Sequence, residues 1–328
     1  MSVDTVAAPR TSRGFRDLPV PLVVIALAAI IYVTAAVVTG QTNQISLAGL
    51  AGLLQRTVAL GLVGLGQTFA ILVGSIDLSV AALISTVAVL ASYLMQGDPG
   101  MIVPAVAACL ALSLVIGAIN GGLVAYWGIN PLIATLATGL ILQGLLSAGF
   151  TYLGGRVAPE FQALAYQGLF GVPLPVLLLA VFALLAWFVL AKTRFGAHLY
   201  AVGGNPDGAK LAGLRVERFV LSAHILASLG ACIAGLYLAA RLQSGTPWIG
   251  RDGIYDLESI AIVVIGGTAL SGGKGGVLGT IAGVLLFASL DASFNMFGVD
   301  AFLKQVLRGA IVIAAVAVYA VRNKGHVA

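Results

Sequence analysis

Residues 176–190 read VLLLAVFALLAWFVL, and residues 311–321 read IVIAAVAVYAV. Both runs are apolar throughout, whereas the strands of a membrane barrel alternate apolar and polar residues. Inside hydrocarbon every backbone N–H and C=O needs a partner within the protein, so a continuous apolar run crosses a membrane as a helix. The two runs therefore predict an all-α membrane protein.

The composition of the whole chain agrees with the two runs. Of the 328 residues, 60% are hydrophobic and only 9% are charged, against about 25% charged residues in a soluble domain. So little charge cannot cover a water-exposed surface of this size. The net charge is +5, but the basic residues flank apolar segments rather than clustering with aromatic residues. We therefore expect contact with membrane lipid and none with nucleic acid.

Ten segments are long or apolar enough to be membrane spans. They cover residues 18–38, 57–74, 78–95, 102–126, 131–152, 173–190, 219–240, 257–270, 276–296 and 302–321. The segment 257–270 is short for a straight span. The moderately apolar residues 41–56 would allow the second helix to begin earlier. The first segment is longer than the apolar core of a signal peptide, so we expect it to be retained.

The basic residues also predict the orientation, because Lys and Arg stay preferentially on the cytoplasmic side. With the N-terminus inside, the interior segments contain eleven of the 17 Lys and Arg residues and the exterior loops contain four; two more lie in the last span. Both termini are therefore expected in the cytoplasm, as tails at 1–17 and 322–328. No loop is long enough to form a separate folded domain.

The sequence contains no evident set of catalytic residues. The candidate metal ligands are scattered as His198, His224, His326, Cys109 and Cys232. Residues 266–276 are rich in glycine and include Lys274, but Gly275 follows where a phosphate loop needs Ser or Thr. Paired aspartates, or a serine with a histidine in mid-span, would suit intramembrane proteolysis, and neither pattern is evident. We expect no catalytic residue, metal or cofactor.

Asp77, within GSIDLS at residues 74–79, is the most conspicuous acidic residue. Deep in lipid a carboxylate costs about 2.5–3.5 kcal/mol. Asp77 could be a carboxylate on a transport pathway or in a proton relay. It could also cap the third helix by accepting hydrogen bonds from its free N–H groups. The permissive Gly74 just before it favours the structural cap.

Several other polar residues fall inside the predicted spans. They are Gln67, Asn120, Asn130, Gln143 and Asn295. Hydrogen bonds between helices explain most such residues, but the five are also candidates for a translocation path. Lys304 and Arg308, four residues apart on one helical face, could line a wet path, contact a partner or extend to lipid headgroups.

The interior segment 195–218 predicts a short helix between two spans. Gly203 and Gly204 end the preceding element, Asn205 is a good N-cap and Pro206 occupies the favoured first position. Gly213 supplies a stop. A helix at about 205–213 could present a rigid projection to a soluble partner, or it could be an ordinary interfacial helix.

An ordered series of motifs resembles the permease subunits of ribose-type ABC importers, along nearly the whole chain. These motifs are GQTF (66–69), ILVGSIDLSV (71–80), NGGLVA (120–125), IATL (133–136), TRFG (193–196), GGN (203–205), IGGTAL (265–270) and GGKGG (272–276). The chain departs from the usual pattern with Ser75 in place of Gly, and with Gly208 where Ala is commoner.

The resemblance implies a permease domain at 18–321, with about ten spans in a fold similar to vitamin B12-type importer permeases. It also implies a location in the bacterial inner membrane and a dimer, either with an identical copy or with a related permease. A cytoplasmic ATP-binding cassette subunit and a periplasmic sugar-binding protein would be the partners. Coupling to the ATPase would involve Gly204, Asn205, Lys210 and Gly213.

The expected function is therefore ATP-driven import of a monosaccharide by alternating access, with ATP hydrolysis on the partner. One alternative is a permease of the same superfamily for branched-chain amino acids, nucleosides or a signalling sugar. Another is an ion-coupled secondary transporter with Asp77 as the coupling carboxylate.

Overall fold

The structure, a computed structural model, describes residues 20–149, 155–169 and 171–324. The predicted tail at 1–17, the end of the fifth predicted span at 150–152 and residues 325–328 of the second tail lie outside these ranges. Most of the described chain is helical, so the prediction of an all-α polytopic membrane protein is confirmed.

Each of the ten predicted segments contains a helix. The helices are α1 (Val20–Val38), α2 (Leu47–Leu72), α3 (Val80–Met95), α4 (Ile102–Ala125), α5 (Pro131–Gly149), α7 (Leu174–Lys192), α10 (Val216–Leu242), α12 (Tyr255–Ile265), α13 (Val277–Met296) and α14 (Ala301–Lys324). Among the described residues, seven helices are long and apolar enough to cross a membrane, namely α1, α2, α4, α5, α7, α10 and α13. The 11 residues of α12 reach only about 16 Å, so ten spans remains a prediction.

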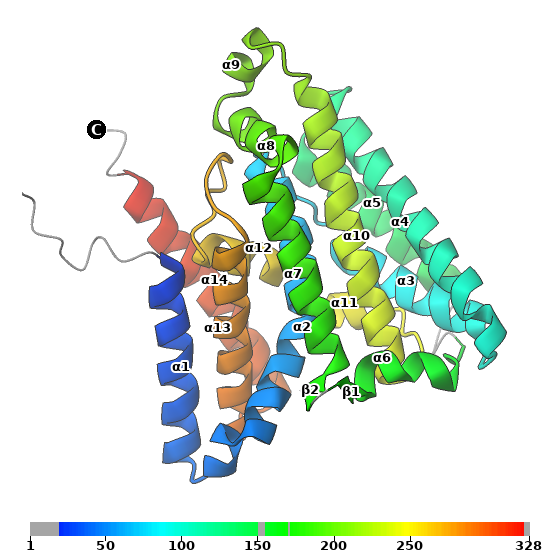
Figure 1. The fold of residues 1–328 in the computed structure, drawn as a ribbon, viewed down its shortest axis with the longest axis vertical. Helices are drawn as coiled ribbons and strands as arrows, with labels where there is room; N and C mark the ends of the chain where they lie inside the picture. The colour runs from blue at the N-terminus through cyan, green and yellow to red at the C-terminus, as the bar shows by residue number, and fades with distance from the viewer. Residues whose placement is uncertain (1–19, 150–154, 170, 325–328) are drawn as a thin grey trace, which may run out of the picture.

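Short elements connect these helices. They are η2 (Thr42–Ile45), η3 (Pro99–Met101), η4 (Pro159–Gln162), α6 (Ala163–Tyr166), α8 (Arg194–Gly204), α9 (Pro206–Leu211), α11 (Ile249–Asp252), and strands β1 (Gly168–Leu169) and β2 (Val172–Pro173). The two strands form a small antiparallel hairpin. In Figure 1, α9 lies at one end of the molecule, and the hairpin, α6 and the turn between α1 and α2 lie at the other.

The second helix begins ten residues before the predicted boundary. Ser46 is its N-cap, and its side chain accepts a hydrogen bond from the Gly49 N–H. The early turns of α2 are rich in glycine and carry Arg56, which hid the start of the helix from a search for apolar runs. This extension matters for the site because Gln55 and Arg56 lie on it.

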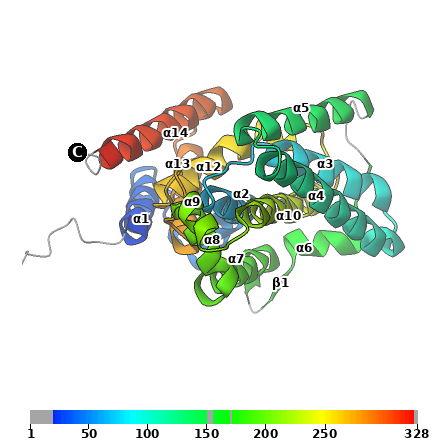
Figure 2. The same cartoon turned by 90° about the horizontal axis from the view of Figure 1, so that it is seen from above.

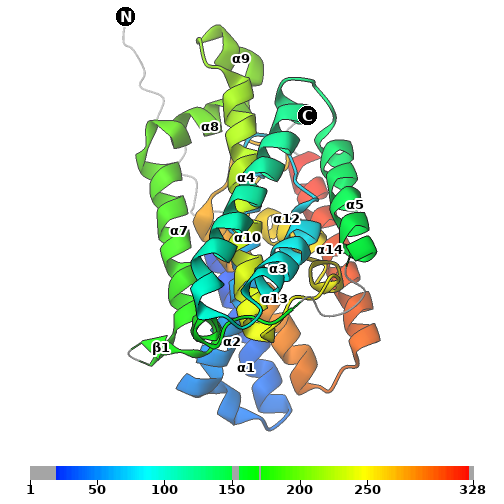
Figure 3. The same ribbon diagram turned by 90° about the vertical axis from the view of Figure 1, so that its right-hand side faces the viewer.

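Helices α2 and α10 form the centre of the bundle. Seen from above, α5 and α14 lie along one side, α7 lies along the other, and α2 and α10 lie between them (Figure 2). Helix α10 packs on α2, α3 and α4, a contact also visible from the side (Figure 3). A Cβ added to Gly230 would come within 2.7 Å of the Leu62 carbonyl, and one on Gly117 within 2.7 Å of the Ile225 Cα. Small residues therefore permit the close approach of these helices.

Candidate functional site

The predicted short helix is present as α9. The Asn205 side chain accepts a hydrogen bond of 2.9 Å from the Gly208 N–H, and Pro206 occupies the first turn. Gly213 has φ +82°, a conformation that costs a residue with a side chain about 1–2 kcal/mol. Lys210 forms an exposed ion pair with Glu217 at 3.5 Å. Leu211 is 92% exposed, so α9 presents an apolar tip beside charged groups.

Backbone contacts tie this end of the chain to the interior. Gly273 N–H donates to the Leu72 carbonyl at 2.9 Å, which joins the glycine-rich turn at 266–276 to the end of α2. Gly204 lies beside Gly273, where an added Cβ would meet the Gly204 Cα at 2.5 Å. The Tyr200 hydroxyl donates to the Gly275 carbonyl at 2.8 Å. Burial raises the pKa of this hydroxyl, which keeps it a donor.

Asp77 is fully buried in the turn between α2 and α3. Its Oδ1 accepts hydrogen bonds from the backbone N–H and the hydroxyl of Ser79, at 2.9 and 2.6 Å. Ser79, not Asp77, occupies the N-cap position of α3. Asp77 therefore fixes the backbone just before the helix. The predicted cap is corrected in one respect: the carboxylate bonds groups of the turn and not the first N–H groups of the helix.

A histidine on α10 completes a buried polar cluster around Asp77. His224 Nδ1 lies 3.2 Å from Asp77 Oδ2, and His224 Nε2 lies 2.8 Å from Ser75 Oγ. This serine–histidine pair was not evident in the sequence because Ser75 and His224 lie 149 residues apart. The order of atoms matches a catalytic serine–histidine–aspartate set. Because His224 and Asp77 have no exposed surface and Ser75 has 3%, the set has no access for a substrate and acts as a packing network.

Two of the five predicted path residues belong to this cluster. Asn120 on α4 donates to Ser79 Oγ at 2.8 Å and to Asp77 Oδ2 at 3.5 Å. The Gln67 amide, oriented so that both of its groups find partners, bonds the backbone C=O and N–H of Asp77 at 3.2 and 3.1 Å. We define the Asp77 cluster as Gln67, Ser75, Asp77, Ser79, Asn120 and His224.

The other three path candidates lie apart from the cluster and from one another. The exposed Asn130 accepts a hydrogen bond from the Leu132 N–H at the start of α5. Gln143 donates to the Pro247 carbonyl at 3.2 Å. Asn295 accepts from Lys304 Nζ at 2.6 Å and lines a cavity of about 310 Å³. Two of the five residues therefore lie together and three lie elsewhere, so a translocation path through them stays a prediction.

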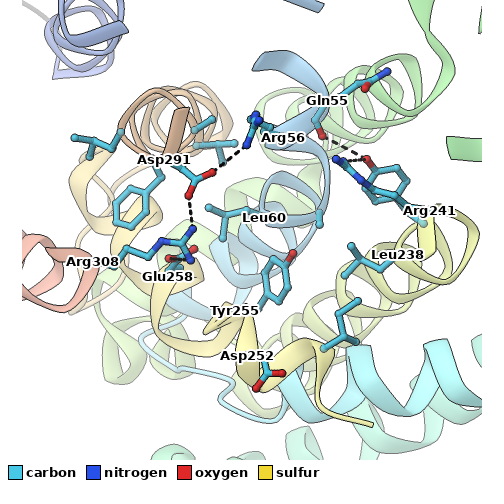
Figure 4. A pocket seen from close by; sticks show the side chains of 18 of the residues that line it. Gln55, Arg56, Leu60, Leu238, Arg241, Asp252, Tyr255, Glu258, Asp291 and Arg308 are labelled. Atoms are coloured by element: carbon cyan, nitrogen blue, oxygen red, sulfur yellow. Dashed lines mark hydrogen bonds and ion pairs between the residues drawn. The ribbon is translucent and has the colours of Figure 1, made fainter. Parts of the chain in front are cut away.

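A larger cavity, of about 490 Å³, lies toward the end of the molecule opposite α9. Its wall combines the first half of α2, the last turns of α10, and parts of α11 to α14. Figure 4 shows Arg56, Tyr255, Glu258, Asp291 and Arg308 around this space. We call it the Glu258 cavity, after its most buried charged residue, which is 6% exposed.

Ion pairs link the charged residues of the cavity. Arg308 Nη2 donates to Asp291 Oδ1 at 2.6 Å, and Arg308 Nη1 lies 3.4 Å from Glu258 Oε1. Arg56 reaches the second oxygen of Asp291 at 3.3 Å. Of the two basic residues singled out on the last span, Arg308 therefore lines a cavity, and Lys304 bonds Asn295. Glu258 was not among the predicted site residues, although an acid in a short apolar segment was a visible signal.

These features define the class of protein: a polytopic all-α membrane permease with a polar cavity toward one end and an exposed capped helix at the other. Residues 49–316 match the family described as "Branched-chain amino acid transport system / permease component", and the chain belongs to this family.

Relatives give the same result over most of the chain. The chain is 34% identical over 301 residues to the ribose import permease protein of Escherichia coli strain K12, covering 89% of this chain and 92% of that one. It is 37% identical over 273 residues to the ribose import permease protein of Bacillus subtilis strain 168, covering 80% and 82%. The D-allose transport system permease protein of E. coli K12 is 32% identical over 264 residues, covering 78% of each chain. No solved structure matches the chain.

The predicted resemblance to sugar permeases of ABC importers is thus confirmed. The chain is a multi-pass membrane permease of this type and not itself an enzyme. The relatives described above are named for ribose and D-allose.

Proposed function

We propose that the chain is the membrane-spanning subunit of an ATP-driven importer in the bacterial inner membrane, with both termini in the cytoplasm. A periplasmic binding protein delivers a monosaccharide, and alternating access moves it inward. A cytoplasmic ATP-binding cassette subunit hydrolyses ATP. A second permease copy, identical or related, completes the membrane part, and about ten spans form a fold similar to vitamin B12-type permeases.

The observation that carries this proposal is the exposed, capped helix α9 with its backbone links to the interior. A helix of six residues is marginal on its own, so its cap and stop point to a function that needs a rigid projection. We assign contact with the ATPase to α9 and its flanks, through Gly204, Asn205, Lys210 and Gly213.

The contacts between the α9 region and the interior connect α9 mechanically to other helices. A push on α9 reaches Gly203 and Gly204 at the end of α8, which pack against the turn at 266–276. That turn is bonded to the Leu72 carbonyl and leads directly into α13. The turn therefore joins the proposed docking site to α2 and α13, both of which line the Glu258 cavity.

The test is to replace the cap and the stop of α9 in the assembled complex. Asn205→Ala removes a cap worth about 1 kcal/mol, and Gly213→Ala strains the positive-φ stop. Both variants should lower sugar uptake and sugar-stimulated ATP hydrolysis together. Ser46→Ala removes a matched cap at the other end of the molecule and should leave both activities unchanged. Wild-type activities in both α9 variants, with normal assembly, would contradict the coupling assignment.

Two alternatives remain testable. An ion-coupled secondary transporter would lose uptake when uncouplers collapse the ion gradient while ATP stays high, and the proposed importer would not. The enclosure of Asp77 by buried hydrogen-bonding groups favours the importer. A permease for amino acids or nucleosides would be revealed by the solute that its binding protein holds.

A further inference from the structure

Glu258 has a hydrogen-bonding capacity that the protein does not use. Its residue is 6% exposed, and no described residue donates a hydrogen bond to its Oε1. A buried polar atom without a hydrogen bond is costly, and Glu258 belongs to the wall of the Glu258 cavity, beside its ion-pair partner Arg308 (Figure 4). Ser113, Asn120 and Ser228 also have unbonded buried oxygens, but they line neither this cavity nor the smaller one.

The cations of the cavity are already engaged. Arg308 donates to Asp291, Arg56 donates to the same carboxylate, and Arg241 donates to the Tyr237 hydroxyl at 2.8 Å. The three arginines face three lining acids, Asp252, Glu258 and Asp291, so the formal charge of the wall sums to zero. An anionic ligand would have to compete with Asp291 for Arg56 and Arg308, or with the Tyr237 hydroxyl for Arg241. A neutral ligand would not.

The surroundings of the Glu258 carboxylate favour a hydroxyl group of a ligand over an ammonium group. A cation placed on Glu258 Oε1 would also approach the Arg308 guanidinium, which lies 3.4 Å from the same oxygen, and like charges would oppose it. A hydroxyl donates without that repulsion, and a hydrogen bond to a carboxylate is stronger than one between neutral groups.

The size and the apolar wall suit a small ring-shaped ligand. The cavity of about 490 Å³ falls within the usual range for small-molecule sites, which combine apolar and aromatic walls with a few polar groups. Its aromatic lining residues are Tyr237, Tyr255, Phe287 and Phe294. Flat aromatic faces can pack against the C–H face of a sugar ring while the carboxylate accepts a hydroxyl.

We propose that the Glu258 cavity binds a neutral polyhydroxylated ligand of monosaccharide size, with the Glu258 carboxylate accepting a hydrogen bond from a ligand hydroxyl. The permease subunit then has a sugar site of its own within one protomer, besides the site on its binding protein. The ligand class rests on the proposed function, whereas the position and polarity of the site rest on the cavity.

The experiment measures binding of radiolabelled sugars to the purified full-length permease in lipid nanodiscs, without binding protein or ATPase. D-ribose, D-allose, D-galactose and D-xylose are the probes. L-leucine is the comparison, because it is a zwitterion that carries an ammonium and a carboxylate group in place of hydroxyls. At least one sugar should bind saturably and L-leucine should not. No saturable sugar binding to the wild type, or tighter binding of L-leucine than of every sugar, would overturn the proposal.

Two variants locate the site. Glu258→Gln should weaken sugar binding at least about tenfold, because a charge-assisted hydrogen bond becomes neutral. Ala288→Phe adds bulk at a lining position and should abolish binding. The controls are Asp256→Asn, on the same helix but not in the cavity wall, and Ala107→Phe, at an exposed position of α4. Both controls should bind as the wild type. Wild-type affinity in both Glu258→Gln and Ala288→Phe would overturn the proposal.

Uptake by the complete complex separates this proposal from the proposed function. Suppose that the wild-type complex imports a sugar with ATP and that the cavity variants still bind sugar normally. This result would contradict the cavity site but not the proposed function. Wild-type complex that imports no sugar with any binding protein would contradict the proposed function, whatever the isolated permease binds.

Discussion

Asp77 and Glu258 are both buried carboxylates in a protein with few charges, but their surroundings differ. Asp77 receives two bonds from Ser79 and contacts His224, all within a packed turn. Glu258 has one cation 3.4 Å away and an oxygen without a hydrogen bond, beside a cavity of about 490 Å³. A carboxylate whose oxygens are bonded within the protein stabilises the fold, whereas one that is left unbonded can bind a ligand.

The two regions also differ in what surrounds the carboxylate. Asp77 is held by groups from its own turn, from α4 and from α10, and these groups join three segments in the half of the bundle that adjoins α8 and α9. Around Glu258 the charged side chains come from α2, α13 and α14. They are Arg56, Asp291 and Arg308; all three are partly exposed, and Arg308 alone pairs with Glu258. We therefore expect mutations in the Asp77 cluster to act on stability, and mutations in the Glu258 cavity to act on ligand binding.

The largest effect is expected from Asp77→Ala. The substitution leaves the Ser79 N–H and its neighbours without an acceptor, and each buried unsatisfied donor costs about 1–3 kcal/mol. We expect a loss of about 3 kcal/mol or more in the free energy of unfolding, measured by thermal unfolding in detergent. Asp98→Ala is the matched control, because Asp98 accepts from the Gly100 N–H two residues later in an exposed turn. Equal losses in the two variants would contradict the comparison.

A smaller loss is expected from Ser75→Ala. The substitution removes the 2.8 Å hydrogen bond to His224 Nε2 and leaves a buried ring nitrogen without this partner, at a cost of about 1–2 kcal/mol. The unfolding midpoint should fall, while sugar binding to the permease should stay at the wild-type value. Ser222→Ala removes an exposed hydroxyl that bonds the Arg218 carbonyl and should leave the midpoint nearly unchanged. A change in sugar affinity with an unchanged midpoint would place Ser75 in the binding site instead.

Glu258→Gln should change stability by less than about 1 kcal/mol in either direction. Removing a poorly paired buried charge recovers its desolvation cost, and Arg308 keeps Asp291 as a partner. The same variant should weaken sugar binding, so the effects on stability and on affinity separate. A large drop in the unfolding midpoint would show that Glu258 is structural, like Asp77.

Local signals made part of this picture predictable from the sequence. The apolar runs located helices such as α4 and α13 to within a residue or two, and the Asn205–Pro206 pair predicted α9 because capping depends on neighbouring residues alone. An earlier start of α2 within residues 41–56 was allowed for, but its position was not predicted. The first turns of α2 are exposed or half-buried and carry glycines and Arg56, which are not typical of a span.

Contacts between distant segments were not predictable. Ser75 and His224 are separated by 149 residues, and only the packing of α10 against the α2–α3 turn brings them together. Glu258 was visible as an acid in a short apolar segment, but its importance depends on Asp291 and Arg308, which come from two other helices. A single sequence holds the residue types of such a site and not their proximity.

The smallest effect is expected from Arg56→Ala, at the exposed edge of the Glu258 cavity. The Arg56 side chain is 45% exposed and its ion pair with Asp291 measures 3.3 Å. Exposed pairs contribute about 0–1 kcal/mol, and salt screens them further. We expect a shift in the unfolding midpoint that disappears at high salt, and sugar binding close to that of the wild type because Arg308 still holds Asp291. A loss of stability larger than that of Ser75→Ala would mean that the charged cavity is itself part of the structural framework, and the contrast between the two carboxylates would fail.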